Sequence, residues 1–267
     1  MDNQYRAIFS RNIGIFTEAE QDKLRMSTVA IAGVGGVGGL AAERLIRLGV
    51  GRMKITDPGD YEESNLNRQF GSSMRNIGKK KIKAVFSQIK EINPQAQIFR
   101  SITGIQSKQD VDIFVDSCDF IIDAMDHGMF KQSILLQRAA RKKGIHYLFT
   151  SAIGFGALAV VFDPKGLTLE EYNNLPLNVD LDNPQELKVP LEKIVPILPS
   201  YATDITVLNE IIAGERPVPT NSIGAGLAAI LAASEAINVI LGKNVPKAPK
   251  YTYLDLLDRR LIAGTIS

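Results

Sequence analysis

The sequence contains one cysteine, Cys118, and only two histidines among its 267 residues. A single cysteine excludes an internal disulfide, and one cysteine with two histidines cannot form a Cys/His zinc cluster. A charge excess is also lacking, because 31 Lys and Arg against 29 Asp and Glu give a formal net charge of +2. No overall field draws such a chain onto nucleic acid or a membrane, so any basic site must be local.

Targeting and membrane signals are also missing. The opening residues MDNQYRAIFSRN carry charge from the second position and lack the apolar core of a secretory signal, so we expect a cytoplasmic protein. The run Ile223 to Ala233 is uncharged and mostly apolar, but it is too short to span a bilayer, and Glu235 follows it closely. Its many Ala and Gly residues predict a buried helix. We therefore expect neither a membrane nor a nucleic-acid partner.

Candidate strands and helices alternate along the chain with short connections, in a composition that is 45% hydrophobic and 22% charged. This alternation predicts an α/β fold, a twisted and largely parallel sheet with helices on both faces. The expected strands are 27–32, 52–57, 97–102, 120–124, 145–151 and 158–162. One expected helix begins at a Thr17–Glu20 capping box, and another begins after a glycine cluster. Further helices are expected over 78–91, 109–117 and 130–143.

Prolines break this pattern between Asp163 and Asn221. A structureless stretch of this length inside a compact domain is usually functional or mobile, so we expect an irregular crossover insertion over 163–221, on the substrate side of a single domain spanning 1–267. A helix over 222–241 and a strand pair, 251–256 and 260–263, should follow. The prolines are Pro164, Pro176, Pro184, Pro190, Pro196, Pro199, Pro217 and Pro219.

A glycine motif follows the first expected strand. Gly33, Gly35 and Gly38, with Gly36 between them, satisfy G-x-G-x-x-G between a strand and a helix, where backbone N–H groups and the helix dipole hold a phosphate. Asp57 ends the second strand, about 20 residues on, where a ribose acceptor is expected. The motif indicates a nucleotide and is equally compatible with NAD.

Several cationic residues follow Asp57 in the sequence, and they favour a polyphosphate as the ligand. Arg68, in the segment SNLNRQF at 64–70, offers a planar fork suited to phosphate oxygens. Lys79, Lys80, Lys81 and Lys83 crowd the first turn of an expected helix, where cations oppose the helix dipole. An anion is the simplest explanation of the cluster, although Lys79, Lys80 and Lys83 taken individually are typical of a solvated basic face.

Acidic residues end the most apolar strand, in the segment FIIDAMD. Asp123 and Asp126 should lie at the carboxyl edge of the sheet, where α/β proteins bind ligands. One carboxylate facing a nucleoside triphosphate suffices for Mg²⁺, which takes its other ligands from water and phosphate. His127 beside them is expected to be a polar loop residue, because magnesium prefers oxygen.

Together these residues resemble the ThiF/MoeB/HesA family of ubiquitin-activating-enzyme-like adenylyltransferases. The resemblance runs from about Ile8 to Pro164, with a weaker similarity over 222–242. The matching blocks, in order, are FSRNIG, GVGGVGG, LGVGRMKITD, SNLNRQF, IGKKK, INP and DAMD.

The resemblance implies a Rossmann-like doubly wound fold and an enzyme that uses ATP and Mg²⁺. It implies that Asp57 binds the ribose, that Asp126 holds Mg²⁺, and that Arg11 reaches into the partner's site of a homodimer. The catalytic residues it implies are Arg11, Arg68, Lys81 and Asp126. The ATP-binding residues it implies are Gly33, Gly35, Gly36, Gly38, Asp57, Asn65, Arg68, Gln69 and Lys81.

Three departures from the family pattern stand out. Gly59 replaces an acidic residue that many relatives carry, and His127 replaces the usual Asn after the magnesium Asp. The paired C-x-x-C motifs are absent, so no zinc is expected, and 163–221 holds no cysteine to accept a thioester. Cys118 precedes a core strand and is expected to be a small buried hydrophobe that catalysis does not need.

The expected reaction is ATP-dependent adenylylation of a carboxylate, giving an acyl-adenylate and pyrophosphate. The commonest substrate in the family is the C-terminus of a small ubiquitin-like sulfur carrier, and a peptide or small-molecule carboxylate of a biosynthetic pathway is the alternative. An NAD(P)-binding oxidoreductase would use the same glycines and Asp57 but leaves Arg68, Lys81 and Asp126 unexplained. A catalytically silent binding module is the remaining possibility.

Overall fold

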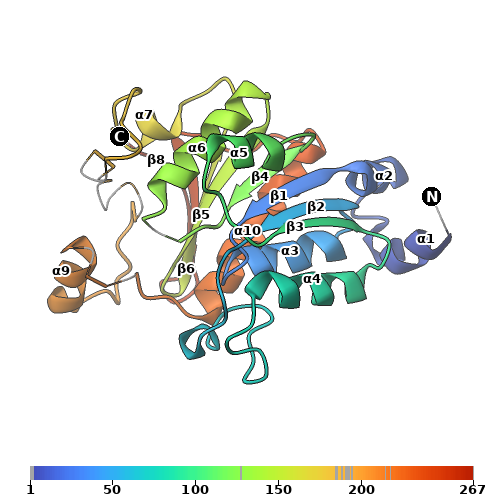
Figure 1. Ribbon diagram of the computed structural model, residues 1–267, viewed down its shortest axis with the longest axis horizontal. Helices are drawn as coiled ribbons and strands as arrows, with labels where there is room; N and C mark the ends of the chain where they lie inside the picture. The colour runs from blue at the N-terminus through green and yellow to red at the C-terminus, as the bar shows by residue number, and fades with distance from the viewer. Residues whose placement is uncertain are drawn as a thin grey trace.

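The computed structural model describes residues 3–126, 128–183, 186–187, 189, 193, 195–213, 215–216 and 218–266. An eight-stranded sheet with the order β3-β2-β1-β4-β5-β6-β7-β8 forms its centre (Figure 1). The strands are β1 (Thr28–Ala32), β2 (Arg52–Thr56), β3 (Gln97–Ser101), β4 (Phe120–Asp123), β5 (His146–Ile153), β6 (Gly156–Phe162), β7 (Lys250–Asp255) and β8 (Arg260–Thr265). The predicted α/β class is therefore confirmed.

Strand direction divides the sheet into two parts. Strands β3, β2, β1, β4 and β5 are parallel, whereas β5 to β8 pair antiparallel. The strand order reverses between β1 and β4, because β1 leads to β2 on one side while β4 lies on the other. A reversal of this kind opens a crevice at the carboxyl ends of the strands, where open α/β sheets bind ligands.

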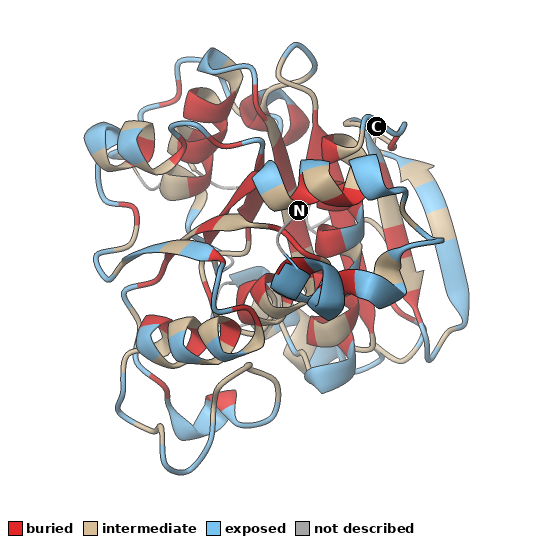
Figure 2. Cartoon of the chain, turned by 90° about the vertical axis from the view of Figure 1, so that its right-hand side faces the viewer, coloured by how far each residue is buried: buried red, intermediate tan, exposed pale blue. Residues whose placement is uncertain are grey.

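Helices cover both faces of the sheet, as Figure 1 shows. α3 (Gly38–Arg47), α4 (Lys81–Ile92) and α10 (Ser222–Ile240) contribute to one apolar core, and α5 (Lys108–Phe114), α6 (Phe130–Lys142) and α7 (Leu169–Tyr172) to the other. β1 is buried throughout and supplies Val29 and Ile31 to the first core and Ala30 and Ala32 to the second. Figure 2 shows the buried residues gathered on the strands and on the helix faces turned toward them.

α10 is long and apolar enough, by length and composition, to cross a membrane, and no other helix in the described ranges is. It packs against α3, β4, β5 and β6. Its small side chains Ala228, Ala229, Ala232 and Ala236 are fully buried, which lets the helix approach the sheet closely. The predicted buried helix is therefore confirmed.

Two helices lie inside the segment that the sequence predicts to be irregular. α7 is opened by a capping box between Thr168 and Glu171, and α9 (Ile205–Ala213) begins after Asp204, whose carboxylate accepts from two backbone N–H groups. α9 has no buried residue and protrudes from the body of the protein (Figure 1). Prolines lie on both sides of each helix. Because both helices are short, the hydrophobic periodicity of the sequence did not predict them.

Helix α4 begins three residues later than the sequence predicts. The chain over 77–80 pairs instead with 59–61, since Gly78 N donates to Tyr61 O at 2.8 Å and Tyr61 N to Lys79 O at 3.0 Å. The first helical residue, Lys81, donates its N–H to Gly59 O at 3.1 Å. The prediction that four lysines share the first turn of this helix is therefore wrong, because Lys79 and Lys80 precede the helix.

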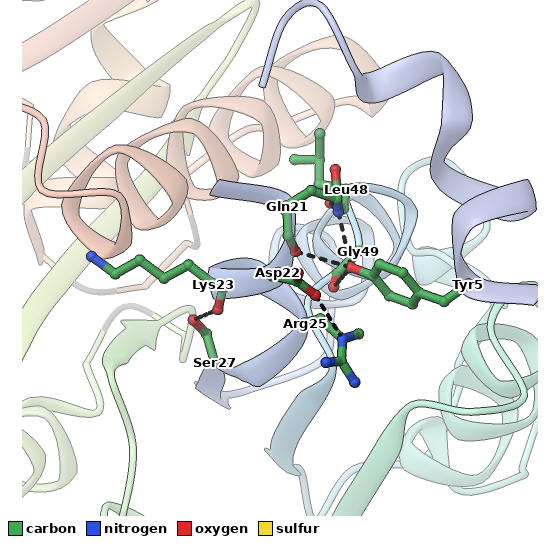
Figure 3. A network of polar contacts seen from close by, with 8 residues as sticks. All are labelled: Tyr5, Gln21, Asp22, Lys23, Arg25, Ser27, Leu48 and Gly49. Carbon is green, nitrogen blue, oxygen red and sulfur yellow. Dashed lines mark hydrogen bonds and ion pairs between the residues drawn. The ribbon is translucent and has the colours of Figure 1, made fainter. Parts of the chain in front are cut away.

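The N-terminal segment is helical, which the sequence analysis does not anticipate. α1 (Asn3–Phe9) and a 3-10 turn, η1 (Ser10–Asn12), precede α2 (Glu18–Met26), whose predicted capping box is confirmed. Tyr5 anchors α1, because its hydroxyl donates to Gly49 O at 2.6 Å and accepts from Gln21 Nε2 at 2.9 Å (Figure 3). This network fixes the segment that carries Arg11 against the end of α3.

Gly49 is required at that junction for two reasons. It ends α3 in a Schellman motif, with φ of +94°, donating to Ile46 O at 3.1 Å. A Cβ there would also lie 2.2 Å from Gln21 Nε2 and 2.4 Å from the Tyr5 hydroxyl.

We therefore expect Gly49→Ala to lower the free energy of unfolding more than Gly144→Ala does. Gly144 also has a positive φ, +71°, but its Cβ would meet no atom within 4 Å. The left-handed conformation should cost about 1 kcal/mol at either position, and the clash at Gly49 about 2 kcal/mol more. Urea unfolding of both variants measures the difference, and equal destabilisation would contradict the packing described for Tyr5.

Cys118 lies in the core just before β4, and burial raises the pKa of its thiol to about 11. Because the thiolate is the reactive form, the side chain should be inert at neutral pH. We expect a thiol reagent such as dithionitrobenzoate to modify Cys118 only on unfolding, and Cys118→Ala to retain the activity expected from the sequence within a few-fold. Rapid modification of the folded protein, or loss of activity in a folded variant, would show that the thiol has a chemical role.

Candidate functional site

The glycine loop between β1 and α3 lies at the switch point of the sheet. Gly33 has φ of +84°, and a Cβ on it would lie 2.5 Å from the carbonyl oxygen of Ala124, directly after β4. A Cβ on Gly38 would lie 1.9 Å from Gly33 O. These two glycines allow the loop to fold tightly against the end of β4. A Cβ on Gly35 or Gly36 would instead be in ordinary contact with the side chains of Gln69 and Arg68, at 3.6 and 3.4 Å.

Asp57, at the end of β2, holds the loop in this position. Its side chain is buried, with 7% exposed, and Oδ2 accepts from Val34 N at 2.8 Å while Oδ1 accepts from Gly59 N at 2.7 Å. Each carboxylate oxygen can accept a further hydrogen bond, so a ribose hydroxyl can still bind. The structure thus gives Asp57 a role that the sequence analysis missed, as the bridge between two loops.

Gly59, which departs from the family pattern, leaves room for Lys81. A Cβ on Gly59 would lie 3.4 Å from Lys81 Nζ and 3.0 Å from Asp57 Oδ1. The Lys81 ammonium therefore lies close to Gly59 and the Asp57 carboxylate. Its side chain has no hydrogen-bond or ion-pair partner in the described part of the chain.

The other lysines of the cluster do not share this environment. Lys80 Nζ donates to Pro58 O at 2.8 Å and to Asp60 Oδ2 at 3.0 Å, and Lys79 Nζ to Asn76 Oδ1 at 3.4 Å. Lys83 is exposed on α4. Lys81 is thus the cation of this group that is left for a ligand.

The segment 64–70 lies against the glycine loop. Asn65, in the 3-10 turn η2 (Glu63–Asn65), is buried and shapes the turn, since Oδ1 accepts from Glu62 N at 3.1 Å and Nδ2 donates to Ser64 Oγ at 3.2 Å. Arg68 Cγ lies 3.4 Å from the Cβ position of Gly36, and its guanidinium donates to Ser64 O and the Asn67 side chain at 3.0 and 2.9 Å. No carboxylate in the described residues pairs with it.

Gln69 has an unpaired polar atom beside the glycine loop. Its side-chain oxygen is buried and has no hydrogen-bond partner, and its amide lies 3.6 Å from the Cβ position of Gly35. A buried acceptor left unpaired costs about 1–3 kcal/mol. A ligand hydroxyl or amino group beside the glycine loop would satisfy it.

The two carboxylates after β4 differ in environment. Asp123 is 2% exposed, accepts from Met125 N at 3.0 Å and from the Tyr147 hydroxyl, and burial raises its pKa. Asp126 is exposed, and within the described ranges its side chain has no partner. Asp126 is therefore the carboxylate that remains free for a metal, whereas Asp123 is structural. His127 lies outside the described residues.

A metal at Asp126 would have to take most of its ligands from elsewhere. Among the described residues there is no group of three or more His, Cys, Asp or Glu side chains suited to a metal ion. A single exposed carboxylate suits Mg²⁺, which keeps several waters and binds substrate phosphates. The residues present thus fit magnesium.

Arg11 and the crossover segment carry the remaining residues considered for the site. Arg11 is exposed on η1, and no partner for its side chain occurs in the part of the chain described. Tyr172 and Lys193, which the sequence analysis did not single out, line a small cavity together with Asp126. The capping box at Thr168 could have placed α7, but no motif marks these two side chains.

Comparison with known proteins identifies the family. The model of the ThiF family matches residues 9–263. The chain is 35% identical over 138 residues to tRNA threonylcarbamoyladenosine dehydratase of Bacillus subtilis (strain 168), which is 51% of this chain and 53% of that protein. It is 30% identical over 146 residues to Sulfur carrier protein ThiS adenylyltransferase of the same organism, 54% of this chain and 43% of that protein. The matches thus span about half the length of these curated relatives.

Solved structures of the same fold cover the whole chain. The crystal structure of E. coli MccB with ATP has a TM-score of 0.73 at 19% identity and covers 100% of this chain and 74% of that chain. The crystal structure of PaaA has a TM-score of 0.73 at 20% identity, with coverage of 100% and 75%. These likenesses establish the fold, and the match over residues 9–263 shows that the chain belongs to the ThiF family.

Proposed function

We propose that this protein uses ATP to activate a carboxylate as an acyl-adenylate. The observation that carries the proposal is the glycine loop flanked by Lys81 and Arg68, neither paired with a carboxylate among the described residues, and by the unpartnered oxygen of Gln69. Cations without counter-ions and a buried acceptor suit a ligand that joins phosphates to a nucleoside. Membership of the ThiF family and the carboxylate of Asp126 support the same conclusion.

In the proposed reaction, a substrate carboxylate oxygen attacks the α-phosphorus of ATP. A new bond joins this oxygen to phosphorus, the bond from the α-phosphorus to the oxygen bridging to the β-phosphate breaks, and pyrophosphate leaves with the electron pair. No proton is transferred. Rate must therefore come from positioning the reactants and from positive charge around the phosphates.

The chain offers a side chain for each part of this task. The Asp57 carboxylate and the Gln69 oxygen can accept from the nucleoside, and the guanidinium of Arg68 and the ammonium of Lys81 can donate to phosphate oxygens. Asp126 would hold Mg²⁺, which neutralises phosphate charge when bound. The acyl-adenylate would pass to an external nucleophile, such as a sulfur donor or an amine, because Cys118 is buried and 163–221 contains no cysteine.

For the substrate, we propose first the C-terminus of a small sulfur-carrier protein. The similarity to Sulfur carrier protein ThiS adenylyltransferase supports this choice. A peptide or small-molecule carboxylate is the second candidate, since the fold is also that of E. coli MccB, which has been crystallised with AMPCPP and MccA. We further propose a cytoplasmic homodimer with no zinc, membrane or nucleic-acid partner.

Nucleotide preference tests the proposal directly. ATP with Mg²⁺ should raise the melting temperature, because a ligand of the native state at 100 times its Kd stabilises by about 2.7 kcal/mol. Lys81→Met should abolish most of this shift and reduce carboxylate-dependent pyrophosphate exchange by about 10²-fold. Lys83→Met, on the exposed face of the same helix, serves as the matched control and should change neither. A shift with NADH and none with ATP would overturn the proposal.

Arg11 should act in the site of the partner subunit. Arg11→Ala and Asp126→Ala should each reduce activity by about 10²-fold. The first removes a positive charge that would stabilise the transition state, and the second removes the carboxylate that would hold the metal. When the two variants are mixed and reannealed, one site of each mixed dimer carries both defects and the other carries neither, so activity should partly return.

Arg6→Ala, an exposed cation on α1, is the control and should leave activity unchanged. If no activity returns although subunit exchange is demonstrated by mass spectrometry, Arg11 acts within its own subunit or lies outside the site.

A further inference from the structure

The loop 62–76 carries Arg68 and Gln69, two of the side chains proposed to contact ATP. The backbone of Tyr61 closes the base of this loop through two hydrogen bonds to the segment before α4, at 2.8 and 3.0 Å. Surface loops whose ends lie close together are held in shape by their own side chains. The position of Arg68 and Gln69 therefore depends on contacts made inside the loop.

The side chain of Tyr61 makes one of these contacts. It reaches from the base of the loop to Phe70, where its hydroxyl donates to the carbonyl oxygen at 2.6 Å. Tyr61 is only 1% exposed, and its burial together with the charge of Asp57 raises its pKa, so the hydroxyl keeps its proton and remains a donor. A buried hydroxyl thus fixes the backbone at the residue directly after Gln69.

Gly71 allows the hydroxyl to approach the backbone this closely. It has φ of +81°, and a Cβ there would lie 2.7 Å from the Tyr61 hydroxyl oxygen. A side chain at this position would push the hydroxyl away from Phe70, and the positive φ also favours glycine. The contact between Tyr61 and Phe70 is therefore built from both sides of the loop.

The backbone connects Phe70 to the two proposed ligand contacts. The N–H groups of Arg68 and Gln69 both donate to Asn65 O, at 3.1 and 2.9 Å, which makes this part of the loop a compact turn. The Cβ of Phe70 lies 3.3 Å from the Cβ position of Gly39, in the first turn of α3. A displacement of Phe70 would therefore also move Arg68 and Gln69 relative to the glycine loop.

We propose that Tyr61 is a positioning residue for ATP, whose hydroxyl holds Phe70 and thereby keeps Arg68 and Gln69 beside the glycine loop. The inference rests on the proposed function, in which these two side chains contact the nucleotide. Tyr61 acts through them, because its own hydroxyl is buried and already bonded to the backbone. Lys81 does not depend on this hydroxyl, since its N–H donates to Gly59 O.

Tyr61→Phe removes the hydroxyl and keeps the buried ring. Calorimetric titration of the full chain with ATP and Mg²⁺ should show an affinity lower by about fivefold to tenfold, as expected for one lost hydrogen bond to a buried carbonyl. The same relative loss should appear in a chain that carries Lys81→Met. Gly71→Ala, which displaces the hydroxyl from the other side, is a second variant that should also weaken ATP binding.

The deciding comparison uses a chain that lacks both side chains proposed to be positioned. In the background Arg68→Met with Gln69→Met, the further substitution Tyr61→Phe should change the ATP affinity by less than about twofold, because effects of coupled residues are not additive. NMR titration measures the weaker binding of these variants, since it extends to high ligand concentrations. A residue that only stabilised the fold would lower the affinity equally in both backgrounds.

Tyr253→Phe is the matched control. Tyr253 is also fully buried, and its hydroxyl donates to Asp255 at 3.1 Å, but it lies on β7, which β4, β5 and β6 separate from β1. This variant should lower the melting temperature, as Tyr61→Phe does, and leave the ATP affinity unchanged. Melting curves show whether each variant is folded at the temperature of the titration.

Unchanged ATP affinity in folded Tyr61→Phe would overturn the inference. A loss of equal size with and without the side chains of Arg68 and Gln69 would also overturn it, because Tyr61 would then act on the fold alone. Failure of the proposed function is a separate result, in which the unmodified protein does not bind ATP.

Discussion

The candidate site depends on the hydrogen bonds that Asp57 accepts from Val34 and Gly59. The first, at 2.8 Å, holds the glycine loop, and the second, at 2.7 Å, holds the loop after β2. Gly59 in turn accepts the N–H of Lys81, the first residue of α4. A single buried carboxylate therefore links the glycine loop, through the loop after β2, to the first residue of α4.

This arrangement makes a local positive region in a chain with almost no net charge. Lys80 is neutralised by Asp60, whereas Lys81 and Arg68 have no carboxylate partner among the described residues. Cations beside the glycine loop that have no counter-ion are available to bind an anionic ligand. Charge already in position requires little reorganisation during the proposed reaction. Because the net charge of the chain is small, the attraction between these cations and an anionic ligand acts only near the site.

The sheet and most of its helices could be predicted from the sequence because they bury apolar residues with regular spacing. β1 and β4 are buried at every position, and their predicted bounds are correct to within one residue. The N-terminal helix α1 could not be predicted, because the contact that fixes it joins Tyr5 to Gly49, 44 residues away. α9 buries no residue, so no core contact distinguished it from a loop.

The same limit applies to the site. Motifs singled out Asp57, Arg68 and Lys81, because their spacing reflects local turns near the glycine loop. Nothing in the sequence predicts that Tyr172 and Lys193 line the same cavity as Asp126, since this depends on how the crossover segment returns to the sheet.

Asp123 and Asp126 show why a motif alone cannot assign chemistry. Both follow the same apolar strand, and sequence gives them equal standing as carboxylates at the edge of the sheet. Asp123 points into the core, where Tyr147 donates to it and where it accepts from Met125 N at 3.0 Å. That second bond constrains the backbone directly before Asp126. The buried carboxylate thus orders the loop, and the exposed one remains available for the proposed metal. Under that proposal, a loss of activity on substituting Asp123 would reflect a displaced loop, and a loss on substituting Asp126 would reflect lost metal binding.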